Sequence, residues 1–207
     1  RLLGLEALGL YTLAKNLVLR PMFIINPIIT RVTFPMMAKI QENTMLLRRT
    51  YLKTIAYLSA VNFPLYLFLA FFARPLVAFV FGAKWSEAAV LLQILSLWAA
   101  VRSTGNPIGS LILAKGRTDI GFYWNLSLLL VIPATIYAGS LWGLAGVCRS
   151  LLIIQAVLLV PAWYFLVYRL CQARFSEYLI EITRPLLLAL VAAIIAFWIT
   201  SWLPSGV

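Results

Sequence analysis

Six long apolar stretches, joined by short polar ones, set the pattern of this chain. They cover approximately residues 8–38, 51–73, 86–113, 120–138, 143–168 and 184–203. A helix rises about 1.5 Å per residue, so about 20 apolar residues cross the hydrocarbon core of a bilayer. The pattern therefore predicts an all-α fold class, a polytopic transmembrane bundle of about six spans.

Prolines and glycines predict local features of these spans. Pro75, after Arg74, is expected to end the second span and leave a short interfacial or re-entrant piece before Trp85. Residues 139–143 predict a tight hairpin between the fourth and fifth spans. Proline removes a backbone donor and bends a helix, so we expect bends at the prolines within spans. These are Pro21, Pro27, Pro64, Pro107, Pro133 and Pro161.

The basic residues between the apolar stretches alternate by side. One set of connections comprises 39–53, 114–119 and 169–184. It holds Lys39, Arg48, Arg49, Lys53, Lys115, Arg117, Arg169, Arg174 and Arg184. The opposite connections hold only Arg74 and Lys84. Because cytoplasmic loops carry the excess of Lys and Arg, we expect the first set in the cytoplasm and the C-terminus on the outer side.

Composition supports an integral membrane protein. The 207 residues are 63% hydrophobic and 11% charged, and the mean hydropathy is +0.97, whereas soluble domains average about 25% charged residues. In a soluble protein the net charge of +11 would suggest a nucleic-acid partner. Here most cations flank apolar spans, so we expect membrane lipids and no nucleic acid as partners.

Five cations lie inside the spans, whereas all six acids are expected in loops or at helix ends. The five cations are Lys15, Arg20, Arg31, Arg102 and Arg149. A charge at bilayer depth costs at least about 2.5–3.5 kcal/mol, so it normally faces a cavity or the bundle interior. Arg20 and Arg102 are too deep to reach the headgroups easily, and we expect them to line a cavity. For the other three, snorkelling to the headgroups stays an alternative.

Polar residues accompany the two deep arginines. Thr12, Asn16 and Arg31 share about one face of a helix with Arg20, because each residue advances about 100°. Asn106 follows Arg102 by one helical turn. We expect Asn16, Asn26 and Asn106 to contribute to a polar cavity lining, although asparagine in a membrane helix is as often a bond between helices.

Such a cavity suits an anion, because arginine binds phosphate both by charge and by paired hydrogen bonds. Proton or sodium coupling would call for an embedded carboxylate, and none is expected here. The chain has no histidine and only two cysteines, Cys148 and Cys171, which we expect to be free thiols. No metal site, cofactor or catalytic residue is therefore predicted.

Three segments resemble a known family in their order and spacing. The first holds Leu2, Leu3, Gly4, Glu6, Ala7, Leu8, Gly9, Tyr11, Leu13 and Ala14, similar to the pattern LLGPEALGxYxLA. The second holds Val32, Phe34, Pro35, Ala38 and Gln41. The third holds Phe81, Gly82, Lys84, Trp85 and residues 88–95, similar to an FGxKW segment and its following helix. Leu5 departs from the usual proline. These segments resemble the bacterial polysaccharide and O-antigen flippases of the multidrug/oligosaccharidyl-lipid/polysaccharide export superfamily, in their colanic-acid-exporter-like branch.

The resemblance implies two six-helix bundles around a central cavity, with residues 1–207 as the C-terminal bundle and the N-terminal bundle missing. It implies a protein of the bacterial inner membrane, so the outer side on which the charge distribution places the C-terminus would be the periplasm. Its substrate would be an undecaprenyl-pyrophosphate-linked oligosaccharide, flipped to the periplasmic leaflet for exopolysaccharide, capsule or O-antigen synthesis. Polysaccharide polymerase and export machinery are the further partners that it implies.

Other functions stay open at this point. A multidrug or small-solute exporter of the same superfamily would share the fold, but cationic drugs call for embedded carboxylates. An anion channel or a structural membrane subunit belongs to a different class. A membrane glycosyltransferase would need a catalytic constellation that the sequence does not offer, so we do not expect an enzyme.

Overall fold

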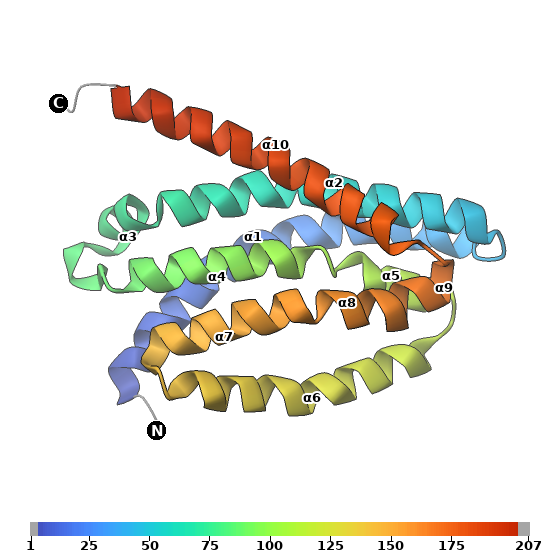
Figure 1. The fold of residues 1–207 in the computed structure, drawn as a ribbon, viewed down its shortest axis with the longest axis horizontal. Coiled ribbons are helices and arrows are strands. Elements are labelled where there is room, and N and C mark those ends of the chain that lie inside the picture. Colours follow the sequence, from blue (N-terminus) through green and yellow to red (C-terminus); the bar gives the residue numbers. More distant parts are fainter. Residues whose placement is uncertain (1–3, 203–207) are drawn as a thin grey trace.

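The chain folds into a bundle of long helices (Figure 1). The computed structural model describes residues 4–202 and the side chains of residues 8–195 except residue 83. Within that range the regular structure is helical throughout, and six helical segments are long and apolar enough to cross a membrane. They are Leu8–Lys39, Thr44–Phe71, Ala88–Ala114, Thr118–Ser140, Gly143–Cys171 and Phe175–Ile195. The predicted fold class is confirmed.

Four of the spans are single helices, which are α1 (Gly4–Lys39), α2 (Thr44–Phe71), α6 (Thr118–Ser140) and α10 (Phe175–Trp202). The third span divides into α4 (Ala88–Ser103) and α5 (Pro107–Ala114). The fifth consists of α7 (Gly143–Val157), α8 (Leu159–Ala162), a π-helical turn η2 (Trp163–Tyr168) and α9 (Arg169–Cys171). Between α2 and α4 lie the short α3 (Ala73–Phe81) and the 3₁₀ turn η1 (Ala83–Trp85).

The helices pack in a row with one helix across it. α10 packs on α2, α2 on α4, α4 on α7 and α7 on α6, while α1 crosses behind and packs on α2, α4 and α5 (Figure 1). The centre of the bundle is α4, which buries Leu92, Leu95 and Ala99 among its neighbours. The span Ala88–Ala114, which contains α4, is the most buried of the six. A side chain on the uncovered face of α4 therefore points into a space between the surrounding helices.

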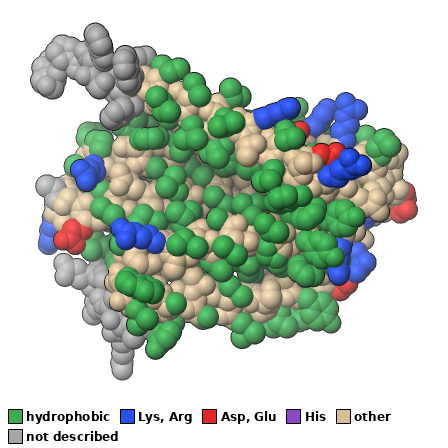
Figure 2. All heavy atoms as spheres, viewed as in Figure 1, with side chains coloured by type: hydrophobic (Ala, Val, Ile, Leu, Met, Phe, Trp, Pro, Cys, Tyr) green, Lys and Arg blue, Asp and Glu red, His purple; other side chains and the backbone are tan. Residues whose placement is uncertain are grey.

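Charged side chains lie mainly near the helix ends. On the face seen in Figure 2 they gather toward the two ends of the bundle, and the band between them is largely apolar. Long apolar side chains such as Leu130 on α6 and Leu188 on α10 point outward and are more than 70% exposed. An apolar belt of this kind is what lipid would cover.

Two predicted helix starts were wrong, and both helices begin earlier than expected. α2 begins at Thr44, because Asn43 caps it by accepting a hydrogen bond from the Leu46 amide at 3.0 Å. α10 begins at Phe175, so Arg184 lies in a helix and not in a loop. Its first turns are amphipathic, and they bury Tyr178 and Ile182. Glu177 and Glu181 consequently also belong to α10.

Only some of the prolines within the spans lie at a break or distortion of the helix. α1 runs on through Pro21 and Pro27, α2 through Pro64, and α6 through Pro133. The third span breaks before Pro107, which becomes the first residue of α5. The fifth is distorted around Pro161, where α8 passes into the π-helical turn. A separate short piece follows the second span, as predicted, but the predicted break at Pro75 was wrong, because α2 already ends at Phe71 and Pro75 lies in the first turn of α3.

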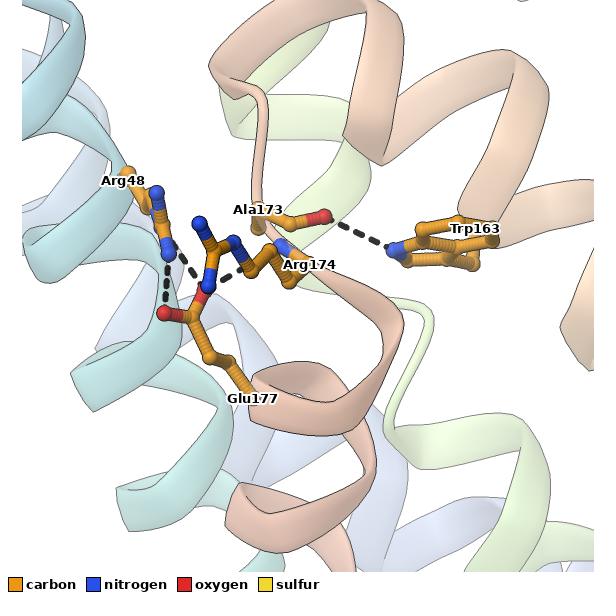
Figure 3. Close-up of polar contacts among 5 residues, drawn as sticks. All are labelled: Arg48, Trp163, Ala173, Arg174 and Glu177. Atoms are coloured by element: carbon orange, nitrogen blue, oxygen red, sulfur yellow. Dashed lines mark hydrogen bonds and ion pairs between the residues drawn. The ribbon is translucent and has the colours of Figure 1, made fainter.

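A cluster of polar contacts joins the ends of three spans (Figure 3). Arg48 of α2 forms a two-bonded ion pair with Glu177 of α10, with Nε donating to Oε2 at 2.7 Å. Glu177 also accepts from the Arg174 amide at 3.1 Å. Trp163 of the π-helical turn donates from Nε1 to the Ala173 carbonyl at 2.9 Å. These bonds fix the short turn between α9 and α10 against α2.

The predicted hairpin at residues 139–143 is present, and it brings α6 and α7 into close contact. Gly143 begins α7 with a φ of 73°, which glycine adopts without strain. A Cβ at Gly146 would lie 2.5 Å from the Gly139 carbonyl oxygen and 2.7 Å from the Trp142 Cβ. The two backbones therefore touch where only glycine fits.

Gly146→Ala is expected to lower the thermal unfolding temperature of the detergent-purified full-length protein, followed by tryptophan fluorescence. Overpacking of this kind typically costs about 1–3 kcal/mol, which exceeds what alanine gains over glycine in a helix, about 1 kcal/mol. Gly109→Ala in α5 is the matched control, because a Cβ there has nothing within 4 Å. Equal unfolding temperatures for the two variants would contradict the close contact.

Candidate functional site

A cavity of about 680 Å³ lies between α1 and α6, with α4, α5 and the fifth span as its floor. Neither α1 nor α6 packs closely on the other, because α1 is held by α2, α4 and α5 and α6 mainly by α7. The polar lining residues are Tyr11, Lys15, Arg102, Thr104, Asn106, Asn125, Gln155 and Tyr178. Most of the remaining lining is apolar, including Met22, Phe23, Ile132, Leu151 and Leu158.

Two cations line this cavity. Arg102 comes from the last turn of α4, and its guanidinium carbon lies 5.2 Å from the centre of the Trp98 ring. Lys15 comes from α1, and its Nζ lies 5.3 Å from the centre of the Tyr11 ring. Each cation therefore rests on an aromatic face, which attracts positive charge without neutralising it. The lining residues include neither aspartate nor glutamate.

The break between α4 and α5 opens on the same cavity. Thr104, Gly105 and Asn106 connect the two helices, and all three line the cavity. The side-chain amide nitrogen of Asn106 is buried and has no hydrogen-bond partner among the described residues. A buried donor without a partner costs about 1–3 kcal/mol, so this nitrogen is available to a group that enters the cavity.

The other predicted site residues lie elsewhere. Asn16, Arg20 and Arg31 are exposed on α1, and Arg149 is exposed on α7; none of them lines the cavity. Among the described residues, the structure gives no ion pair to any of the five embedded cations. The exposed face of α1 also carries large apolar residues such as Ile24 and Ile28.

Asn26 belongs to a contact between helices. It is 6% exposed, and its Oδ1 accepts a hydrogen bond from Asn62 Nδ2 of α2 at 3.3 Å. Thr30 Oγ1 donates to the Asn26 carbonyl at 3.0 Å. In this structure Asn26 joins α1 to α2, which is the alternative that the sequence left open.

Sequence reasoning missed several polar residues of the cavity. Asn125 of α6 and Gln155 of α7 are single amides in otherwise apolar runs, and that contrast was an available signal. Trp98 and Tyr11 gave no signal, because aromatic residues are frequent in membrane spans. Cys148 and Cys171 are buried free thiols and do not line the cavity.

Comparisons with known proteins agree with the resemblance. Residues 1–90 match the family described as "Polysaccharide biosynthesis protein". The chain is 35% identical over 198 residues to the lipopolysaccharide biosynthesis protein WzxC of Escherichia coli. This match covers 95% of this chain and 40% of WzxC. It is 35% identical over 204 residues to the teichuronic acid biosynthesis protein TuaB of Bacillus subtilis, covering 97% and 41%. No solved structure matches the chain.

A more distant relative is the amylovoran biosynthesis protein AmsL of Erwinia amylovora, which is 27% identical over 179 residues. That match covers 86% of this chain and 46% of AmsL. The chain thus spans less than half the length of these three relatives. The six candidate spans and these similarities together identify a multi-pass bacterial membrane protein. The chain belongs to the polysaccharide biosynthesis family of WzxC and TuaB.

Proposed function

We propose that this chain is the C-terminal bundle of a flippase that moves a lipid-linked oligosaccharide from the cytoplasmic to the periplasmic leaflet. The oligosaccharide would be carried on undecaprenyl pyrophosphate and serve surface polysaccharide synthesis. The observation that carries the proposal is the cavity between α1 and α6, in which Lys15 and Arg102 lie without a carboxylate. A site with two uncompensated cations favours an anionic substrate over a cationic drug.

The exposed face of α1 supports a second bundle. Arg20 and Arg31 are exposed there at membrane depth without an ion pair among the described residues. Arginine facing lipid is costly, and a partner bundle across a watery passage removes that cost. In this arrangement Arg20 and Asn16 line the central passage, Arg31 lies at its inner mouth, and Arg149 lies toward its outer side.

Orientation follows from the distribution of charge. We place the ends that carry Arg48, Lys115 and Arg174 in the cytoplasm, which puts the C-terminus in the periplasm. Rocking of two bundles about the passage then changes access from one side to the other, while the lipid tail stays in the bilayer. Partners of this activity would be the polymerase and export machinery that take over the glycan.

The test is rescue of surface polysaccharide by the full-length protein in a strain that lacks its own flippase. We expect rescue, together with loss of the lipid-linked glycan that accumulates in the cytoplasmic leaflet of the parent strain. An anion channel or a structural subunit would leave the accumulated glycan in place. Persistent accumulation at normal membrane abundance of the protein would therefore overturn the proposal.

A further inference from the structure

The short helix α3 lies at the end of the bundle where one span stops and the next begins. α2 ends at Phe71, α3 covers Ala73–Phe81, and α4 starts at Ala88 (Figure 1). Because α2 and α4 belong to two successive candidate spans, the connection between them lies where the hydrocarbon core gives way to the lipid headgroups. The two spans therefore place α3 at the surface of the bilayer.

Only one face of α3 is packed against the rest of the chain. Ala73 and Val77 are fully buried, and α3 packs on α4 and on α2. In contrast, Phe79 is 92% exposed and Val80 is 55% exposed. Phe71, in the last turn of α2, is 48% exposed. Apolar surface of this size is unfavourable in water, so this end of the bundle requires an apolar neighbour.

Two cations accompany the exposed apolar side chains. Arg74 lies in the first turn of α3, Lys84 lies in η1, and both are exposed. η1 packs on α3, so the two cations belong to one local unit. Neither forms an ion pair among the described residues. The next acid in the chain, Glu87, precedes the first turn of α4, where the partial positive charge of the helix start favours it.

The turn after α3 holds this unit together. Gly82 has a φ of 85° and a ψ of 167°, a combination that is essentially restricted to glycine. Its amide donates to the Ala78 carbonyl at 3.0 Å, and its carbonyl accepts from the Trp85 amide at 3.1 Å. The chain therefore passes from α3 into η1 along a defined path, and η1 stays packed on the helix.

We propose that α3 and η1 form a surface anchor that binds the headgroups of anionic phospholipids. Phe79 and Val80 enter the boundary between headgroups and acyl chains, as the apolar face of an interfacial helix does. Arg74 and Lys84 contact the headgroup phosphates, because an anionic membrane surface attracts Lys and Arg. Lipid fits better than an acidic protein, since a bilayer offers apolar and anionic surface side by side. None of these four residues lines the cavity, and the inference does not depend on the proposed function.

A fluorescent probe on α3 of the full-length protein tests whether lipid covers this helix. Ala78→Cys places an NBD label on the exposed side of α3 next to Phe79, in a background whose native cysteines are replaced by alanine. In phosphatidylcholine vesicles, nitroxide-labelled lipid should quench the label, and aqueous iodide should not. Quenching by iodide alone would place α3 in water, and quenching by neither would show that protein covers it. Either result would overturn the proposal.

Lipids of different charge test the role of the two cations. Nitroxide-labelled phosphatidylglycerol should quench the label at about fivefold lower mole fraction than nitroxide-labelled phosphatidylcholine, since one cation at an anionic surface contributes about 1 kcal/mol. The double variant Arg74→Gln/Lys84→Gln should respond equally to the two lipids. Glu87→Gln is the matched control, because it removes a charge of opposite sign from the same connection and should preserve or increase the preference. Equal quenching in the parent, or an unchanged preference in the double variant, would overturn the phosphate contact.

Phe79→Ser tests the apolar contact separately from the charges. Loss of the phenyl ring is expected to raise quenching of the label by iodide, because α3 then leaves the acyl boundary. The thermal unfolding temperature should stay near that of the parent, since the Phe79 side chain is almost fully exposed and packs little within the chain. Unchanged iodide quenching would show that Phe79 does not hold α3 in the membrane surface.

Discussion

Replacing both Arg20 and Arg102 with alanine is expected to abolish export of surface polysaccharide. Arg102 lines the cavity beside Trp98, and Arg20 lies exposed on α1. In the proposed mechanism both attract the anionic lipid-linked substrate. Each single change should lower export at least tenfold, and the double change should leave none detectable.

Export would be measured as surface polysaccharide in a strain that lacks its flippase, with the variants at equal membrane abundance. Arg49→Ala is the matched control, because Arg49 is exposed near the start of α2 and does not line the cavity. Full export by the double variant would mean that these arginines have a structural role, and the anion-guided mechanism would then have no support in this chain.

The sequence predicts the fold class well because hydropathy is a local property. Each span is a continuous apolar run, and a bilayer leaves such a run few alternatives to a helix. The same reasoning finds the tight turn at Gly143 and the short separate piece that forms α3. Both depend on residues that are adjacent in the chain.

Helix ends and breaks were harder to predict because they depend on contacts between distant residues. The start of α10 is amphipathic, and it is held by the pairing of Glu177 with Arg48 of α2. No local pattern announces a partner that lies more than a hundred residues away. Likewise, the helix breaks before Pro107, beside the cavity, whereas it continues through Pro27 and Pro64.

The sequence predicted that cations would line a cavity, but not which of them would share it. Lys15, Arg102 and Asn106 do line one cavity, but Arg20 and Arg31 point to another face of α1. The polar face of α1 shows which of its residues lie on the same side of the helix, but not which neighbouring helix or cavity that side meets. The presence of embedded cations can therefore be read from the sequence, while the surface that each of them faces has to come from packing.

Filling the cavity should stop export without disturbing the fold. Gly109 of α5 lines the cavity, and a Cβ there would have nothing within 4 Å. Gly109→Trp places a large side chain in the cavity that Arg102 also lines, so the anionic substrate can no longer enter. Surface polysaccharide should fall below detection, while the thermal unfolding temperature of the purified protein should stay near that of the parent.

Two further variants separate blockage from other effects of this substitution. Gly109→Ala adds only a methyl group in open space and should preserve export. Ala156→Trp adds the same indole at an exposed position of α7 outside the cavity, and it should also preserve export because lipid can accommodate it. Normal export by Gly109→Trp would show that no part of the substrate passes through this cavity, whereas loss in all three variants would show that the assay reports membrane insertion. Loss confined to Gly109→Trp would place the transported lipid between α1 and α6, since that variant alone closes the space there.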